Sequence, residues 1–215
     1  TLTASDIEYG SFTDSRDGHI YKTVTIGDQV WMAENLAYLP SVVGPATESY
    51  TASYYYVYGY DGTSVATAKA KTNYQTYGVL YNWPAALTAC PSGWHLPSDA
   101  EWKQLEMYLG MTQVEADKSG YRGTDEGDKL KEVGTSNWRI SNTGATNESG
   151  FTALPGGFRD YAGTFTNIGY LGVWWSSTQN NTEIAYYRSL FYSLSDVRRN
   201  TNRMANGLSV RCLRD

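Results

Sequence analysis

Residues 90–102 read CPSGWHLPSDAEW and contain the clearest helix start in the chain. The Ser98 hydroxyl can accept a hydrogen bond from the backbone N–H of Glu101, and the Glu101 carboxylate can reach back to the N–H of Ser98. This reciprocal arrangement is a capping box. Gly110 is typical of a helix end, so we predict a helix between Ser98 and Gly110. Three large apolar residues at helical spacing predict its buried stripe: Trp102, Leu105 and Leu109.

A second, shorter helix precedes this one, from about Trp83 to Ala89. Asn82 can cap it, and Pro84 falls in the first turn, where proline is tolerated. Pro91 closes it. A further helical turn is expected from Asp128 to Val133.

Strands are expected on both sides of the helices. In residues 18–36, apolar and polar positions alternate up to Gly27-Asp28, which is typical of a two-residue hairpin turn. From residue 151 to residue 215, short segments rich in β-formers are separated by glycines. Residues 41–77 are rich in Tyr, Ser and Thr, and predict a surface excursion with one strand pair.

The order of these elements predicts the fold class. A hairpin, two helices and then many short antiparallel strands argue for an α+β fold. A length of 215 residues favours a single domain over residues 1–215.

Composition excludes some classes of protein. The net charge of −5 is opposite to the basic footprint of a nucleic-acid binder. No apolar run approaches the roughly 20 residues that a transmembrane helix needs. The chain is rich in Tyr and Trp, with 19 and 7 residues respectively, and both types suit half-exposed binding faces as well as strand packing.

Several segments together resemble the Fibrobacter succinogenes major paralogous domain family, which occurs in secreted and lipoprotein chains of gut bacteria. The resemblance covers the chain from about residue 17 to the end. It is carried by residues 21–24 (YKTV), 31–36 (WMAENL), 81–83 (YNW), 89–102 (ACPSGWHLPSDAEW), 151–159 (FTALPGGFR), 174–178 (WWSST) and 209–212 (SVRC).

The resemblance implies a C-type-lectin-like fold and an extracytoplasmic location, secreted or on a cell-surface lipoprotein, with a lipid anchor upstream of Thr1 left open. It implies no activity. In that fold the elements that carry Cys90 and Cys212 are neighbours, so we expect a disulfide between them. The C-terminal part is also similar to the variable region of C-type-lectin-like proteins diversified by retroelements.

The sequence contains few motifs that indicate catalysis or metal binding. The loop and strand motifs with which C-type lectins hold calcium are absent from the sequence, so we expect no metal and no cofactor. Residues 95–102 are similar to a helix-opening motif of formylglycine-generating oxidases, whose chemistry needs reactive cysteines. A nucleophilic pair of Cys90 and His95 is a further catalytic alternative. A glycosidase-type carboxylate pair stays open; the available acids are Glu34, Glu101 and Glu183.

The segment from Gln179 to Asn206 is dominated by Tyr, Arg, Asn and Ser, the composition of many binding surfaces. An ordinary hairpin with a polar face is the alternative. The strand near residue 188 carries aromatics on both faces, and we expect the Arg188 face to be outward because an unpaired buried guanidinium is costly. The predicted ligand-binding residues are Tyr186, Arg188, Leu190, Tyr192, Arg198, Asn200, Asn202 and Arg203.

The expected function is therefore ligand binding, in adhesion or recognition, at a bacterial cell surface. The expected partner is a protein or a glycan, with no nucleic acid. A structural or assembly module of the cell envelope is the second interpretation, and an enzyme related to formylglycine-generating oxidases is the third.

Overall fold

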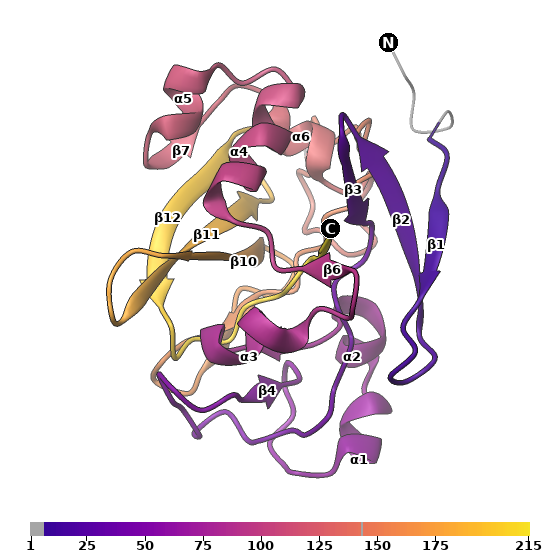
Figure 1. Ribbon diagram of the computed structural model, residues 1–215, viewed down its shortest axis with the longest axis vertical. Coiled ribbons are helices and arrows are strands. Elements are labelled where there is room, and N and C mark those ends of the chain that lie inside the picture. Colours follow the sequence, from indigo (N-terminus) through magenta and orange to yellow (C-terminus); the bar gives the residue numbers. More distant parts are fainter. Residues whose placement is uncertain (1–6, 143) are drawn as a thin grey trace.

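The computed structural model describes residues 7–142 and 144–215. Within these ranges the chain forms short helices and many strands (Figure 1). The helices are α1 (Val65–Lys69), α2 (Thr72–Tyr77), α3 (Trp83–Ala89), α4 (Asp99–Tyr108), α5 (Gln113–Asp117) and α6 (Glu126–Leu130). The strands are β1 (Gly10–Thr13), β2 (Ile20–Ile26), β3 (Gln29–Met32), β4 (Tyr55–Tyr56), β5 (Leu80–Tyr81), β6 (Trp94–His95), β7 (Gly120–Arg122), β8 (Phe158–Arg159), β9 (Phe165–Thr166), β10 (Leu171–Gln179), β11 (Ile184–Phe191), β12 (Val197–Arg203) and β13 (Leu213–Arg214).

Two sheets dominate the architecture. A five-stranded sheet has the order β1-β2-β3-β13-β6, and a four-stranded sheet has the order β10-β11-β12-β7. The remaining pairs, β4-β5 and β8-β9, are small, and all of the named strands pair antiparallel. Helices and antiparallel sheets of this kind confirm the α+β class, whereas the C-type-lectin-like fold stays a prediction.

The local predictions for the hairpin and the two main helices are confirmed. β2 and β3 pair with Ile26 opposite Gln29, which leaves Gly27-Asp28 as the turn. Asn82 caps α3 through its side chain, and both halves of the capping box at Ser98 and Glu101 are present at the start of α4.

Other elements differ from the sequence prediction in number and extent. The excursion over residues 41–77 contains β4, α1 and α2, and its strand pairs with β5, which lies just outside the excursion. The helical turn expected from Asp128 is α6, which begins earlier, at Glu126, and ends at Leu130. No helix in the described residues is long and apolar enough to cross a membrane.

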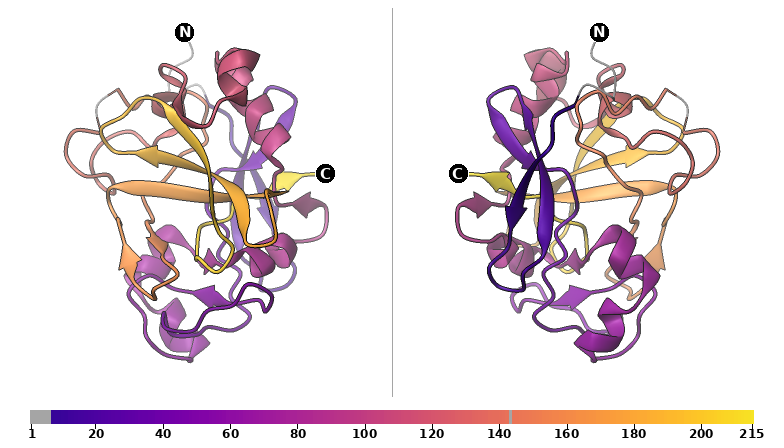
Figure 2. Two further views of the ribbon diagram at one scale, coloured as in Figure 1. Left: turned by 90° about the vertical axis from the view of Figure 1, so that its left-hand side faces the viewer. Right: turned by 90° about the vertical axis from the view of Figure 1, so that its right-hand side faces the viewer.

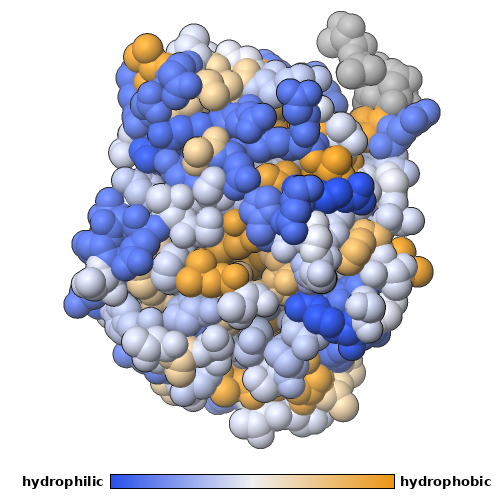
Figure 3. All heavy atoms as spheres, in the orientation of Figure 1, coloured by the Kyte–Doolittle hydropathy of each residue, from blue (hydrophilic) through white to orange (hydrophobic). Residues whose placement is uncertain are grey.

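α4 lies between the two large sheets (Figure 1). Its Trp102 packs against Trp31 of β3, with ring centroids 4.9 Å apart, and donates an N–H to the backbone carbonyl of Trp175 in β10 at 3.4 Å. The surface over α4 and α5 is mainly hydrophilic (Figure 3), which fits a helix whose apolar stripe faces inward. The predicted stripe of Trp102, Leu105 and Leu109 is buried.

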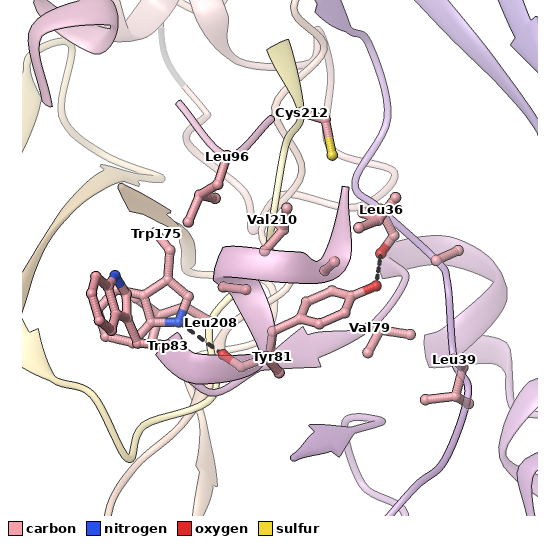
Figure 4. Packing of buried hydrophobic residues seen from close by; sticks show 14 of the residues in the cluster. Leu36, Leu39, Val79, Tyr81, Trp83, Leu96, Trp175, Leu208, Val210 and Cys212 are labelled. Carbon is pink, nitrogen blue, oxygen red and sulfur yellow. Dashed lines mark hydrogen bonds between the residues drawn. The ribbon is translucent and has the colours of Figure 1, made fainter. Parts of the chain in front are cut away.

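The four-stranded sheet separates two apolar cores. Trp174 and Leu190 belong to the core shared with α4, while the neighbouring Trp175 and Tyr187 belong to the core under α3. Figure 4 shows the second core, in which the Trp175 indole donates to the backbone carbonyl of Tyr81 at 2.8 Å. Because side chains alternate across a strand, Trp174 and Trp175 face different cores, and so do Tyr187 and Leu190.

Cys90 and Cys212 form a disulfide, as the resemblance implied. Their Cα atoms are 5.9 Å apart, and 122 positions separate them in sequence. The bridge joins the end of α3 to the segment that leads into β13, so it ties the middle of the chain to its C-terminal strand.

Candidate functional site

The predicted binding residues divide between the two faces of the four-stranded sheet. In the register of β11 and β12, Arg198 lies opposite Ser189 and Asn200 lies opposite Tyr187, so these four side chains share one face. Arg188 lies opposite Arg199 and therefore points to the other face. The predicted set does not form one surface.

The face that carries Arg188 is turned inward, so the expectation that it is outward is wrong. Arg188 is only 1% exposed and Leu190 only 2%. Tyr186 and Tyr192 are half-buried, and Tyr192 packs against the core that contains Leu190. The argument for exposure assumed an unpaired guanidinium, but the protein provides partners for this one.

Arg188 belongs to a buried network of charges between α4 and the sheet. Its Nε donates to Glu106 at 2.6 Å, and its Nη1 donates to Asp99 at 2.7 Å. Arg199 binds Asp99 through two N–H groups at 2.8 Å each, and Arg122 binds Glu106. Two carboxylates of α4 therefore hold three arginines from three different strands.

The network shifts the ionisation of its members. Burial alone would raise the pKa of the Asp99 carboxyl, but the hydrogen bonds from Arg199 and the charge of Arg188 outweigh burial and hold that pKa well below 3.8. Burial lowers the pKa of the Arg122 guanidinium, against the opposing effect of Glu106. We interpret this network as a clamp that fixes α4 on β7, β11 and β12.

The opposite face is buried against the core under α3 around Tyr187, and it opens to solvent further on, along β7 and β12. We call this opened part, with Tyr187 at its buried border, the open face. It consists of Tyr121, Tyr187, Arg198, Asn200 and Asn202. β12, in yellow, lies in front of the rest of the sheet in the left panel of Figure 2. Tyr121 is 46% exposed, Tyr187 is 8% exposed, and the two asparagines and Arg198 are half-buried.

Arg198 is the charged group of the open face. Its guanidinium lies over the Tyr121 ring, 5.3 Å from the centroid, and the two residues are cross-strand partners. Burial raises the pKa of the Tyr187 phenol, and the nearby Arg198 charge partly opposes that rise. Within residues 7–142 and 144–215 this guanidinium has no hydrogen-bond acceptor and no carboxylate within 4.0 Å.

The two asparagines use their carbonyl oxygens locally. Asn200 accepts from the backbone N–H of Thr201 at 2.8 Å, and Asn202 accepts from Arg203 at 3.0 Å and from Asn206 at 2.6 Å. The side-chain NH₂ of Asn200 has no acceptor in the described part of the chain. The open face thus offers amide and guanidinium donors beside the exposed ring of Tyr121.

Arg203 is exposed but lies apart from the open face. Its guanidinium lies 4.2 Å from the centroid of the Tyr161 ring, which belongs to the turn between β8 and β9. A further pair of this kind joins Arg139 to Tyr170 at 4.7 Å. Tyr170 also contacts Tyr192, so Tyr192 of the predicted set lies beside the Arg139–Tyr170 pair.

Two residues of the open face were missed from sequence. Tyr121 is in β7, a strand of three residues that is too short for a periodic signal. Tyr187 was assigned to the inner face because the opposite set of β11, with Arg188, was expected to be outward.

Residues considered for catalysis from the sequence have structural contacts in the fold. Cys90 is in the disulfide, and His95 is held between Asp215 at 2.7 Å and Glu101 at 2.9 Å. Glu34 accepts from the backbone N–H of Lys22 at 2.8 Å and lines two hollows of about 280 and 260 Å³. In the described residues, no group of three or more His, Cys, Asp or Glu side chains is arranged to hold a metal ion.

Comparison with known proteins identifies a family. The family model described as the Fibrobacter succinogenes major domain matches residues 24–214. A search of the curated proteins found no match. A search of the solved structures also found none.

Proposed function

The chain belongs to the Fibrobacter succinogenes major domain family, and from this premise we propose that it is an extracytoplasmic domain that binds a protein or glycan ligand through its open face. The domain serves adhesion or recognition at a bacterial cell surface. It acts by holding its ligand, not by catalysis.

The disulfide supports the proposed compartment. Disulfides persist in the periplasm, on cell surfaces and in secreted proteins, and they are rare in the reducing cytosol. The Cys90–Cys212 bridge also occupies both cysteines of the chain, so neither is available as the reactive thiol of a formylglycine-generating type of enzyme. This use of the cysteines favours binding over that oxidase activity.

One observation carries the choice of the open face. The Arg198 guanidinium lies over an exposed tyrosine and has no acceptor among the described residues, whereas Arg188 and Arg199, on the same pair of strands, are fully engaged. A guanidinium with unused donors beside aromatic rings is typical of a residue that contributes strongly to binding. The rigid strands beneath it reduce the entropy lost when a ligand binds.

The alternative function is a structural or assembly module without a ligand of its own. It is favoured by the burial of Arg188 and Leu190, since these two residues of the predicted set lie inside the domain and are not available to a ligand. The two functions differ in what the open face does. A ligand-binding role requires that its residues can be replaced without loss of stability, and a structural role requires the reverse.

A glycan array and an array of cell-surface proteins would test the proposal. We expect the domain to bind a member of one array, and Tyr121→Ala, Arg198→Ala and Asn200→Ala each to weaken that binding. Each variant should change the free energy of unfolding by no more than about 0.5 kcal/mol. Arg139→Ala is the matched control, since it removes an arginine–tyrosine pair from another surface.

The array result would reject the proposal in either of two ways. Binding that all three variants retain at full strength would place the ligand elsewhere on the domain. Loss of several kcal/mol of stability in these variants, with no binding to either array, would favour the structural module.

A further inference from the structure

The open face also indicates a class of ligand. We propose that it binds a glycan that carries carboxylate groups, such as an oligosaccharide of uronic acids. This inference rests on the proposed function, because it assumes that the open face is where a ligand binds.

The charge of the ligand is inferred from Arg198. Arginine presents its donors in a planar fork that matches a carboxylate, and it cannot lose its proton under ordinary conditions. The buried arginines use this fork inside the protein: Arg188 binds Asp99 and Glu106, and Arg199 binds both oxygens of Asp99. Arg198 has the same fork and no carboxylate within 4.0 Å in the described residues, so an anionic group from a ligand would complete it.

The surroundings of Arg198 also favour an anion. Tyr121 lies beneath the guanidinium and Ser189 lies opposite it on β11, so its nearest neighbours across the sheet are uncharged. The whole chain, by contrast, has a net charge of −5. A guanidinium that no carboxylate of the described residues neutralises is therefore a local point of attraction for an anion on a molecule whose net charge is negative.

The size of the open face favours a glycan over a protein. Three strands at about 4.8 Å spacing and the residues from Arg198 to Asn202 at about 3.3 Å each give an area of roughly 10 by 13 Å. A stable protein interface buries about 800 Å² on each partner and has an apolar centre. Among the described residues of the open face, the exposed large apolar side chain is Tyr121, which suits a sugar ring better than a protein core.

The remaining groups suit the other parts of a sugar. The Tyr121 ring can pack against the apolar C–H face of a pyranose, as aromatic rings present wide surfaces with polar tips. The NH₂ group of the half-buried Asn200, which has no acceptor among the described residues, can donate to a ring hydroxyl. The carboxylate would then bind Arg198 in the neighbouring row of the sheet.

The test uses a defined pair of probes, an oligosaccharide of galacturonic acid and the same oligosaccharide with its carboxyl groups reduced to alcohols. We expect calorimetric titration to show binding of the acidic probe at least tenfold tighter than that of the neutral one. Added salt should weaken this binding, since part of the attraction is between opposite charges.

Variants assign the effect to the open face. Arg198→Ala should lower affinity for the acidic probe at least tenfold, and Arg198→Lys should restore only part of it, because an ammonium lacks the planar fork. Tyr121→Ala should weaken both probes, and Arg139→Ala should change neither.

The outcomes separate the inference from the proposed function. Equal binding of both probes, lost in the open-face variants, would overturn the requirement for a carboxylate and leave the function intact. Binding of neither probe would overturn the inference, and the two arrays would then decide the function alone. Binding of the acidic probe that Arg198→Ala does not change would overturn the assignment to the open face.

Discussion

Two arginines of this domain have opposite surroundings although both are on the same pair of strands. Arg188 is buried between Asp99 and Glu106, whereas Arg198 lies over an exposed tyrosine. The carboxylates that pair with Arg188 are 89 and 82 positions away in sequence. A strand pattern reports only neighbours along the chain, so the burial of this arginine could not be predicted from it.

The clamp leads to a prediction about stability. Arg188→Met removes the charge but keeps a long apolar chain, and we expect it to lower the free energy of unfolding by about 3 kcal/mol, the low end of the effect of breaking a buried pair. The low end applies because Asp99 keeps Arg199 and Glu106 keeps Arg122. Urea unfolding of Arg188→Met beside Arg198→Met measures the difference, and the second variant should be within about 0.5 kcal/mol of the parent. Equal midpoints for the two variants would show that the clamp is not needed.

A second prediction concerns His95, which binds Asp215 through Nδ1 and Glu101 through Nε2. Partial burial lowers the pKa of His95, but hydrogen bonds to the two carboxylates outweigh burial and raise that pKa above 6.5. A raised pKa in the folded state means that the charged ring stabilises the fold below pH 6.5 and that this contribution is lost as the pH rises through the folded value. His95→Gln should therefore be less stable than the parent below pH 6.5, and the difference should shrink at alkaline pH.

Denaturant midpoints of the parent and of His95→Gln, measured from pH 5 to pH 9, would check this dependence. Burial raises the pKa of the Glu101 carboxyl, but hydrogen bonds from Ser98 and His95 outweigh burial and lower that pKa, so Glu101 does not add a transition of its own within this range. A difference that is constant across the range would mean that the charge of His95 does not contribute.

At the scale of elements, the predictions from sequence succeeded where a local signal exists. The capping box and the Gly27-Asp28 turn act over a few neighbouring residues, and both are present as predicted. α1, α2 and α5 have only five or six residues, too few for an apolar stripe to repeat, so the sequence did not predict them. The open face was only partly predicted. The Tyr, Arg and Asn content of the segment marks β12 as a candidate binding strand, but the position of Tyr121 beside Arg198 depends on the pairing of β12 with β7.

The orientation of α4 can be tested by two substitutions in one helix. Trp102 is buried against Trp31 and Phe151, so Trp102→Ala should cost about 3–5 kcal/mol. Ser98 caps the helix, accepting from Glu101 at 3.3 Å and donating to it at 2.8 Å, so Ser98→Ala should cost about 1 kcal/mol. Gln104→Ala, on the exposed side, is the control and should cost no more than about 0.5 kcal/mol. An effect of Trp102→Ala no larger than that of the control would contradict the inward orientation.

At the scale of the whole molecule, the same sheet serves two purposes. Its inner face is fixed to α4 by the charge clamp, and its outer face carries the open face on the same strands. Because the clamp holds β7, β11 and β12 together, Tyr121, Arg198 and Asn200 are positioned before any ligand arrives. Preorganisation of this kind lowers the entropic cost of binding.

The last prediction concerns the Cys90–Cys212 bridge, which joins the end of α3 to the C-terminal segment. The bridge closes a loop between residues 122 positions apart, and a loop of that size restricts the unfolded chain enough to contribute about 2–5 kcal/mol. The double variant Cys90→Ala with Cys212→Ala removes the bridge without leaving a lone thiol. Its free energy of unfolding should be lower by that amount, and its urea midpoint should fall accordingly. Its affinity at the open face should stay unchanged, because the bridge lies outside β7, β11 and β12. Alkylation followed by mass measurement gives an independent check: two reactive thiols in oxidised, denatured protein would rule the bridge out, and so would an unchanged urea midpoint in the double variant.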